Sequence, residues 1–140
     1  MADLEGILRF RKWELDEKRR ELAVLFEERA VIERRIEALD QEMIEQSVMK
    51  ESDIGSMTLG AYIEGARKKR AWLIEDLRKK DEEIADKQDV VSEAFRELKT
   101  FEIADQRQKD RAKQAQAKQE QAELDELGLQ AYEKSMQQNG

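Results

Sequence analysis

The strongest constraint on the fold is an apolar residue every three or four positions, in two long runs with one short break. The first run extends from Leu4 to Met43 and the second from Ile63 to Phe101, with residues 51–56 between them. This spacing is typical of helices that bury one narrow stripe against another helix. The sequence therefore predicts an all-α protein, a long antiparallel two-helix coiled-coil hairpin.

The residue types that are missing support long helices and limit the possible chemistry. The 140 residues include no Pro, and one interior Pro would cost a helix about 3 kcal/mol. They also include no Cys and no His, so the thiolate nucleophile, the commonest general base and the commonest metal ligand are missing. A two-helix rod has no interior for a pocket. We therefore expect a protein that is not an enzyme, with no catalytic residue, cofactor or metal site.

Charge and hydropathy limit the classes of partner. The net charge of −7 and the isoelectric point near 4.9 disfavour nucleic-acid binding, which depends on basic patches. No run approaches the roughly 18 apolar residues needed to span a bilayer, and the N-terminal residues do not resemble a signal peptide. We expect a cytoplasmic protein with no direct membrane insertion.

The ends of the two runs predict one domain over residues 1–140. We expect a first helix at about 3–48, a bend at about 51–57 and a second helix at about 58–127. Between residues 104 and 123 the only apolar residue type is Ala, and the first helix has no residues left to cover this segment. The C-terminal helix should therefore overhang its partner. Gly128 is expected to end it and to leave a loose tail over residues 128–140.

The first stripe has twelve positions, of which nine are apolar and three are the basic residues Arg11, Lys18 and Arg29. Such long side chains can lay their methylenes along the stripe and carry the charge to water. A bend centred near residue 53 places Arg29 opposite Leu77 and Lys18 near Lys87. That pair of like charges requires either a shifted register or neutralisation by neighbouring carboxylates, for which the candidates are Glu14, Glu21 and Glu83.

Aromatic residues outside the stripe are candidate binding residues. Phe10, Trp13 and Trp72 lie off the stripe, whereas Phe95 lies at its edge and is expected to belong to the core. Large aromatic side chains on the outer face of a rod are the usual anchors of protein interfaces. The alternative is that another segment, such as the Gln-rich tail, covers them.

A second candidate surface surrounds the bend, where Met and other apolar residues gather away from the stripe. Met57 and Tyr62 belong to this group. Met is common in adaptable binding surfaces, so the group could dock a partner. It could equally form a small apolar cap that closes the tip of the hairpin.

Two segments resemble the FliJ family of flagellar type III protein export. Phe95-Arg96-Glu97-Leu98-Lys99-Thr100-Phe101-Glu102 is similar to the family's Arg-x-x-Lys-x-x-Glu segment. Glu120-Gln121-Ala122-Glu123-Leu124-Asp125-Glu126-Leu127 is similar to its C-terminal signature, which makes Asp125, Glu126 and Leu127 candidate binding residues. The hairpin with an overhanging C-terminal helix also resembles the family.

The resemblance implies a non-catalytic stalk and adaptor of the flagellar export ATPase complex, cytoplasmic and peripheral to the inner membrane. The implied partners are the hexameric export ATPase, the export-gate membrane protein and export chaperones. Phe10 and Trp13 would lie toward the end that enters the ATPase ring, and Tyr62 and Trp72 toward the half that contacts the gate. The free protein is expected to be monomeric.

Two other functions fit the same pattern. One is the equivalent stalk of a virulence type III secretion system. The other is a structural coiled coil that self-associates, for example a parallel homodimer in which the stripe pairs with its copy in a second chain.

Overall fold

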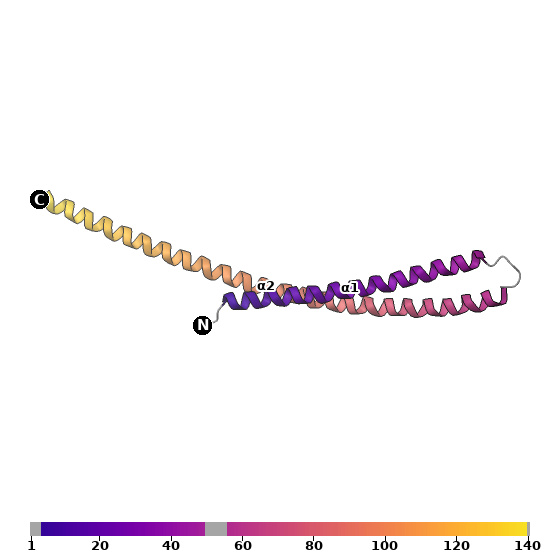
Figure 1. Ribbon diagram of the computed structural model, residues 1–140. Helices are drawn as coiled ribbons and strands as arrows, with labels where there is room; N and C mark the ends of the chain where they lie inside the picture. The colour runs from indigo at the N-terminus through magenta and orange to yellow at the C-terminus, as the bar shows by residue number, and fades with distance from the viewer. Residues whose placement is uncertain (1–3, 50–55, 140) are drawn as a thin grey trace.

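The structure is a computed structural model that describes residues 4–49 and 56–139. In that range the chain forms two α-helices and no strand: α1, Leu4–Met49, and α2, Ser56–Gln138. The helices run antiparallel and wind around each other, and α2 continues far beyond the N-terminal end of α1 (Figure 1). The predicted all-α hairpin with an overhanging C-terminal helix is confirmed. Of the predicted bend at 51–57, residues 51–55 lie outside the described residues.

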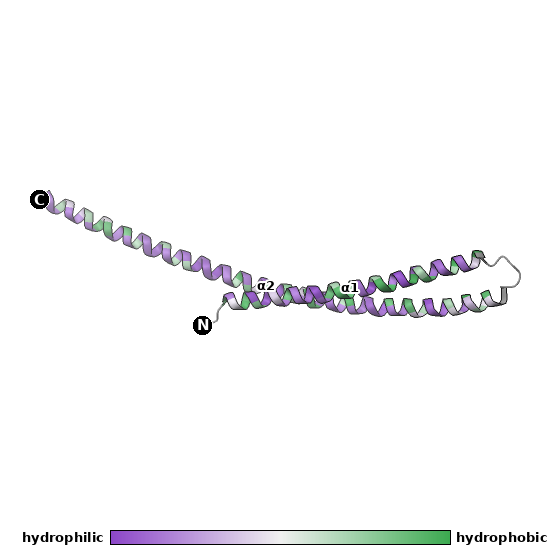
Figure 2. Ribbon diagram, in the orientation of Figure 1, coloured by the Kyte–Doolittle hydropathy of each residue, from purple (hydrophilic) through white to green (hydrophobic). Residues whose placement is uncertain are grey.

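A single narrow stripe forms the core. The buried hydrophobic residues are Leu15, Leu39, Ala66, Ile84, Ala94 and Leu98. Leu15, Ala94 and Leu98 form one cluster, against which Leu8 and Val91 pack. Figure 2 shows short apolar patches that alternate with hydrophilic turns along both helices. The hairpin is therefore held by contacts at intervals along its length.

Ion pairs between the helices lie beside this stripe and mark the register. Arg11 Nη1 lies 2.6 Å from Glu97 Oε2, and Arg70 Nε lies 2.8 Å from Asp40 Oδ1. Lys80 Nζ likewise lies 2.6 Å from Glu28 Oε2. Most of the basic residues set into the stripe thus pair with a carboxylate of the opposite helix. The sequence predicts only that their charges reach water, so these ion pairs are an additional finding.

At Arg29 the ion pair reaches about one helical turn beyond the predicted neighbour Leu77, because Arg29 Nε donates to Asp81 Oδ1 at 2.6 Å. Val91 packs against the cluster that contains Leu15, as the predicted register requires. The carboxylate of Glu21 neutralises the like-charge pair of Lys18 and Lys87, as one of the two predicted alternatives requires. Lys87 Nζ donates to Glu21 Oε2 at 2.7 Å, and Lys18 Nζ lies 3.5 Å from the same oxygen. Both lysines therefore pair with one carboxylate.

The C-terminal segment differs from the expected loose tail. Helix α2 passes through Gly128 and ends at Gln138. A glycine inside a helix costs about 1 kcal/mol relative to Ala, but good helix formers such as Leu127, Gln130 and Ala131 surround this one. We call the part of α2 from residue 104 to residue 138 the overhang.

Candidate partner-binding surfaces

The end of the hairpin that carries α1's N-terminus presents two exposed aromatic rings. Phe10 is 53% exposed and Trp13 is 58% exposed. Their ring centroids lie 6.1 Å apart with the planes inclined by 29°. The two residues fall on one face of α1 because they are three positions apart. The structure thus brings together two of the side chains singled out from the sequence.

Arg11 orders this end of the molecule. Its guanidinium carbon lies 5.3 Å from the centre of the Phe101 ring and 5.7 Å from the centre of the Phe10 ring. Its Nη1 donates to Glu14 at 3.0 Å and to Glu97 at 2.6 Å. The sequence places Arg11 in the stripe but contains no signal that it would link the exposed ring of Phe10 to the buried seam. That link restricts how the Phe10 ring can move.

The candidates near the bend do not form one cluster. Trp72 is 70% exposed, whereas Tyr62 is half-buried. Burial, together with the neighbouring carboxylate of Glu42, raises the pKa of the Tyr62 hydroxyl above its ordinary value. The side chain of Met57 lies outside the described residues. Tyr62 therefore lies partly within the seam, whereas the Trp72 side chain is exposed on the outer surface.

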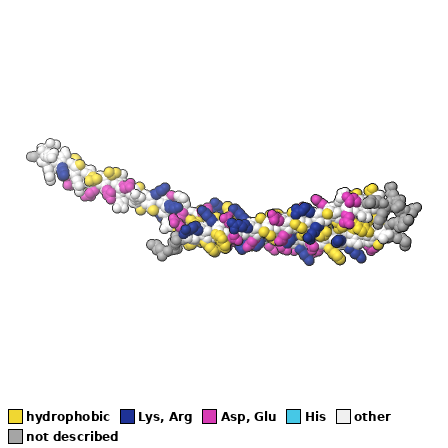
Figure 3. All heavy atoms as spheres, viewed as in Figure 1, with side chains coloured by type: hydrophobic (Ala, Val, Ile, Leu, Met, Phe, Trp, Pro, Cys, Tyr) yellow, Lys and Arg dark blue, Asp and Glu magenta, His cyan; other side chains and the backbone are white. Residues whose placement is uncertain are grey.

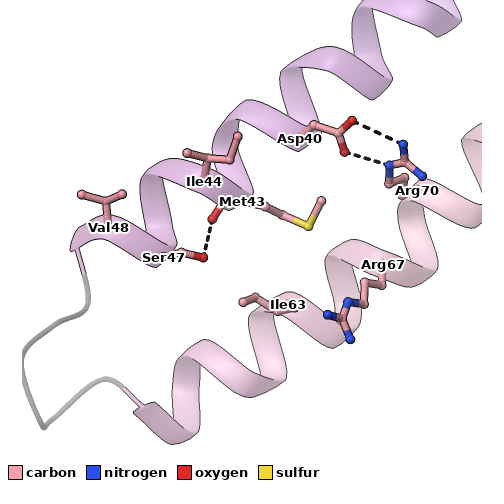
Figure 4. A pocket seen from close by; sticks show the side chains of 8 residues that line it. All are labelled: Asp40, Met43, Ile44, Ser47, Val48, Ile63, Arg67 and Arg70. Atoms are coloured by element: carbon pink, nitrogen blue, oxygen red, sulfur yellow. Dashed lines mark hydrogen bonds and ion pairs between the residues drawn. The ribbon is translucent and has the colours of Figure 1, made fainter.

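A hollow lies between the helices close to the bend (Figure 4). It has a volume of about 740 Å³, and its lining residues are Asp40, Met43, Ile44, Ser47, Val48, Ile63, Arg67 and Arg70. Met43 and Ile63 extend into the space between the two helices, while the Asp40–Arg70 ion pair bounds its inner end. Ile44 and Val48 remain more than half exposed. Among the described side chains, the apolar group near the bend is thus an open surface.

The overhang is the third surface. Every residue from Gln106 to Asn139 is exposed. Asp125 Oδ1 accepts a hydrogen bond from Gln121 Nε2 at 3.0 Å, and Glu126 and Leu127 line a shallow hollow on the helix surface. Leu129, Tyr132 and Met136 are exposed on the same segment. The sequence reasoning missed these three because it assigned them to a loose tail.

The described parts of the chain hold neither a metal-binding cluster nor a membrane span. In residues 4–49 and 56–139, no group of three or more acidic side chains is placed to hold a metal ion. Neither described helix has a stretch apolar and long enough to cross a membrane.

Comparison with known proteins agrees with this architecture. The family model described as "Flagellar FliJ protein" matches residues 1–137. Two curated relatives named flagellar FliJ protein come from Caulobacter vibrioides, strains NA1000 / CB15N and ATCC 19089 / CIP 103742 / CB 15. Each is 32% identical over 127 residues, which cover 89% of this chain and 90% of the relative. No solved structure matches the chain significantly. The family match over nearly the whole length and the identity of these relatives show that the chain belongs to the FliJ family of flagellar proteins.

Proposed function

We propose that this protein is a non-catalytic stalk and adaptor of the flagellar type III export ATPase complex. The end of the hairpin that carries α1's N-terminus and the overhang enters the hexameric ATPase ring. The half near the bend contacts the export-gate membrane protein, and the protein also escorts export chaperones. It acts in the cytoplasm, held at the inner membrane through the export apparatus. Membership of the FliJ family supports the flagellar assignment over a virulence secretion system.

The observation that carries the proposal is the exposed Phe10–Trp13 pair beside Arg11. Binding anchors are enriched in Trp, Tyr and Arg, and they are most effective when their conformation is fixed before binding. Here the cation of Arg11 lies over Phe10 while its Nη1 is held by Glu97 of the opposite helix. The pair is therefore presented in a restricted geometry at the end of the rod.

The remaining candidates follow the two ends of the hairpin. Asp125, Glu126 and Leu127 on the overhang would contact the ATPase together with the Phe10–Trp13 pair. Near the bend, Trp72, Met57 and Tyr62 belong to the half proposed to meet the gate. The open hollow beside Ile63 and Arg67 supports a docking surface there.

The test is to measure how strongly the full-length protein stimulates its cognate export ATPase. The double variant Phe10→Ala and Trp13→Ala should lower the stimulation at least tenfold, because each ring offers an anchor of about 1 kcal/mol or more. Both side chains are exposed, so helicity measured by circular dichroism should stay unchanged.

The matched control is Val24→Ala with Ile74→Ala. These side chains are also large, apolar and exposed, but they lie outside the proposed surfaces. This control variant should stimulate the ATPase as strongly as the unmodified protein does. If the Phe10/Trp13 variant stimulates the ATPase as well as the control does, the aromatic pair is not part of the coupling surface.

A further inference from the structure

The seam of the hairpin changes character in the middle of the rod. We call residues 18–29 of α1 and 80–87 of α2 the middle section, which is about 18 Å long. Its seam positions hold four basic and three apolar residues: Lys18, Leu22, Leu25, Arg29, Lys80, Ile84 and Lys87. The seam on either side of it holds one basic residue, which is Arg11 toward the N-terminal end of α1 and Arg70 toward the bend. The middle section therefore has less apolar surface to bury than the seam that flanks it.

Burial follows the same division. The buried hydrophobic residues on the two sides of the middle section are Leu15, Ala94 and Leu98 toward the N-terminal end of α1, and Leu39 and Ala66 toward the bend. Within the middle section, Ile84 is the one buried hydrophobic residue. Its neighbours in the seam, Leu22 and Leu25, are half-buried. The rod thus has several buried side chains on each side of its middle and a single one within it.

Ion pairs take the place of apolar contacts in the middle section. Lys80 Nζ lies 2.6 Å from Glu28 Oε2 of α1 and 3.2 Å from Glu83 Oε2 of its own helix. The carboxylates that join the two helices here, those of Glu21, Glu28 and Asp81, belong to side chains that are each more than 40% exposed. Acidic and basic side chains lie side by side along the surface of the hairpin (Figure 3). Because water and salt screen exposed ion pairs, they contribute little to stability, and they hold the middle section weakly.

We propose that the middle section is a soft joint, at which the two helices separate and rejoin while the seam on both sides stays closed. Proteins open locally, with free energies below that of global unfolding, where few buried apolar contacts hold them. The end of α1 that carries Phe10 and Trp13 lies on one side of this joint and the bend lies on the other (Figure 1). The joint therefore lets one candidate surface change its orientation relative to the other. The proposal concerns the hairpin alone and does not depend on the export function.

The first test is the profile of amide hydrogen exchange along the full-length protein. Polar residues in a helix seam can serve only to fix the register. In that case the helices fray from their ends, and the amides of the middle section exchange slowest. A soft joint gives the opposite order, so amides of the middle section should exchange at least tenfold faster than those of residues 32–43 and 91–101. The slowest exchange in the middle section would overturn the proposal.

The second test measures distances across the rod with spin labels, which the absence of native Cys allows. Glu27→Cys with Glu82→Cys spans the middle section, and Gln41→Cys with Lys68→Cys spans the hairpin near the bend. All four positions are exposed, so the labels leave the seam intact. Double electron–electron resonance should give a distance distribution at least twice as broad for the middle pair. Higher salt should broaden it further because screening weakens the ion pairs. Equal widths at the two pairs contradict a soft joint.

The third test fills the seam with apolar side chains. Lys18→Leu with Lys87→Leu removes the two charges that share Glu21 and leaves that exposed carboxylate to water. Exchange in the middle section should slow at least tenfold, and the middle distance distribution should narrow to the width found near the bend. The control Lys12→Leu with Lys79→Leu makes the same chemical change at exposed positions outside the seam and should alter neither measurement. A filled seam that stays as soft as the unmodified one shows that the polar layers are not the cause, and this result also overturns the proposal.

Discussion

Replacement of Leu15 by Ala tests whether the narrow seam holds the hairpin together. Leu15 is 4% exposed and lies in the cluster with Ala94 and Leu98. Truncation of a buried Leu to Ala costs about 2–5 kcal/mol, depending on how far the site collapses. A two-helix seam has no second layer behind it, so the helices can move together and water can enter. We therefore expect the lower end, about 2–3 kcal/mol.

The assay is urea unfolding followed by circular dichroism at 222 nm. With a slope of roughly 2 kcal/mol per molar urea, the loss lowers the midpoint by about 1 M. The matched control is Leu124→Ala, the same chemical change on the exposed overhang. It should change the free energy of unfolding by less than about 0.5 kcal/mol. Equal losses in the two variants would refute the view that the seam is the main source of stability.

Two further predictions concern single residues. The hydrogen bond from Lys87 holds the pKa of Glu21 below its ordinary value of 4.5. Because folding lowers this pKa, the ion pair stabilises the folded protein at pH values above 4.5. That stabilisation is lost as the pH falls through the lowered pKa of Glu21 in the folded protein. In urea unfolding from pH 6 to roughly pH 3, the stability difference between the unmodified protein and Glu21→Gln should therefore shrink in acid, and a difference independent of pH would contradict this role. Gly128→Ala should stabilise the overhang helix by about 1 kcal/mol, since a Cβ there meets no atom within 4 Å. Amide exchange near residue 128 should slow roughly fivefold, and an unchanged rate would show that the glycine does not limit the helix.

The fold was predictable because it depends on a local pattern. The three-and-four spacing determines which face of each helix is buried, and a single break between two such runs favours a hairpin. The register was not predictable to the residue. Sliding one helix along the other by a turn keeps apolar residues opposite each other, and the choice then depends on pairs such as Arg29 with Asp81. The bend length alone does not specify those pairs.

The sequence pattern also does not determine whether a residue at the edge of the stripe is buried or exposed. Phe95 was expected in the core but is exposed, with Lys99 Nζ 5.4 Å from the centre of its ring. A helix pair buries only the centre of the stripe, so edge positions depend on local winding and on neighbouring long side chains. Trp13 and Trp72, far from the stripe, were predicted as exposed for the same geometric reason, and both are. The link through Arg11 required the structure because it joins residues on different helices.

The separation between the buried seam and the exposed candidate surfaces determines how binding data on this protein can be interpreted. Seam residues such as Leu15 and Ile84 are buried, whereas Phe10, Trp13 and Trp72 have more than half of their surface exposed. Truncation of an exposed side chain removes little of the packing that stabilises the rod. A loss of partner binding in such a variant, with unchanged helicity, therefore reports on the interface itself.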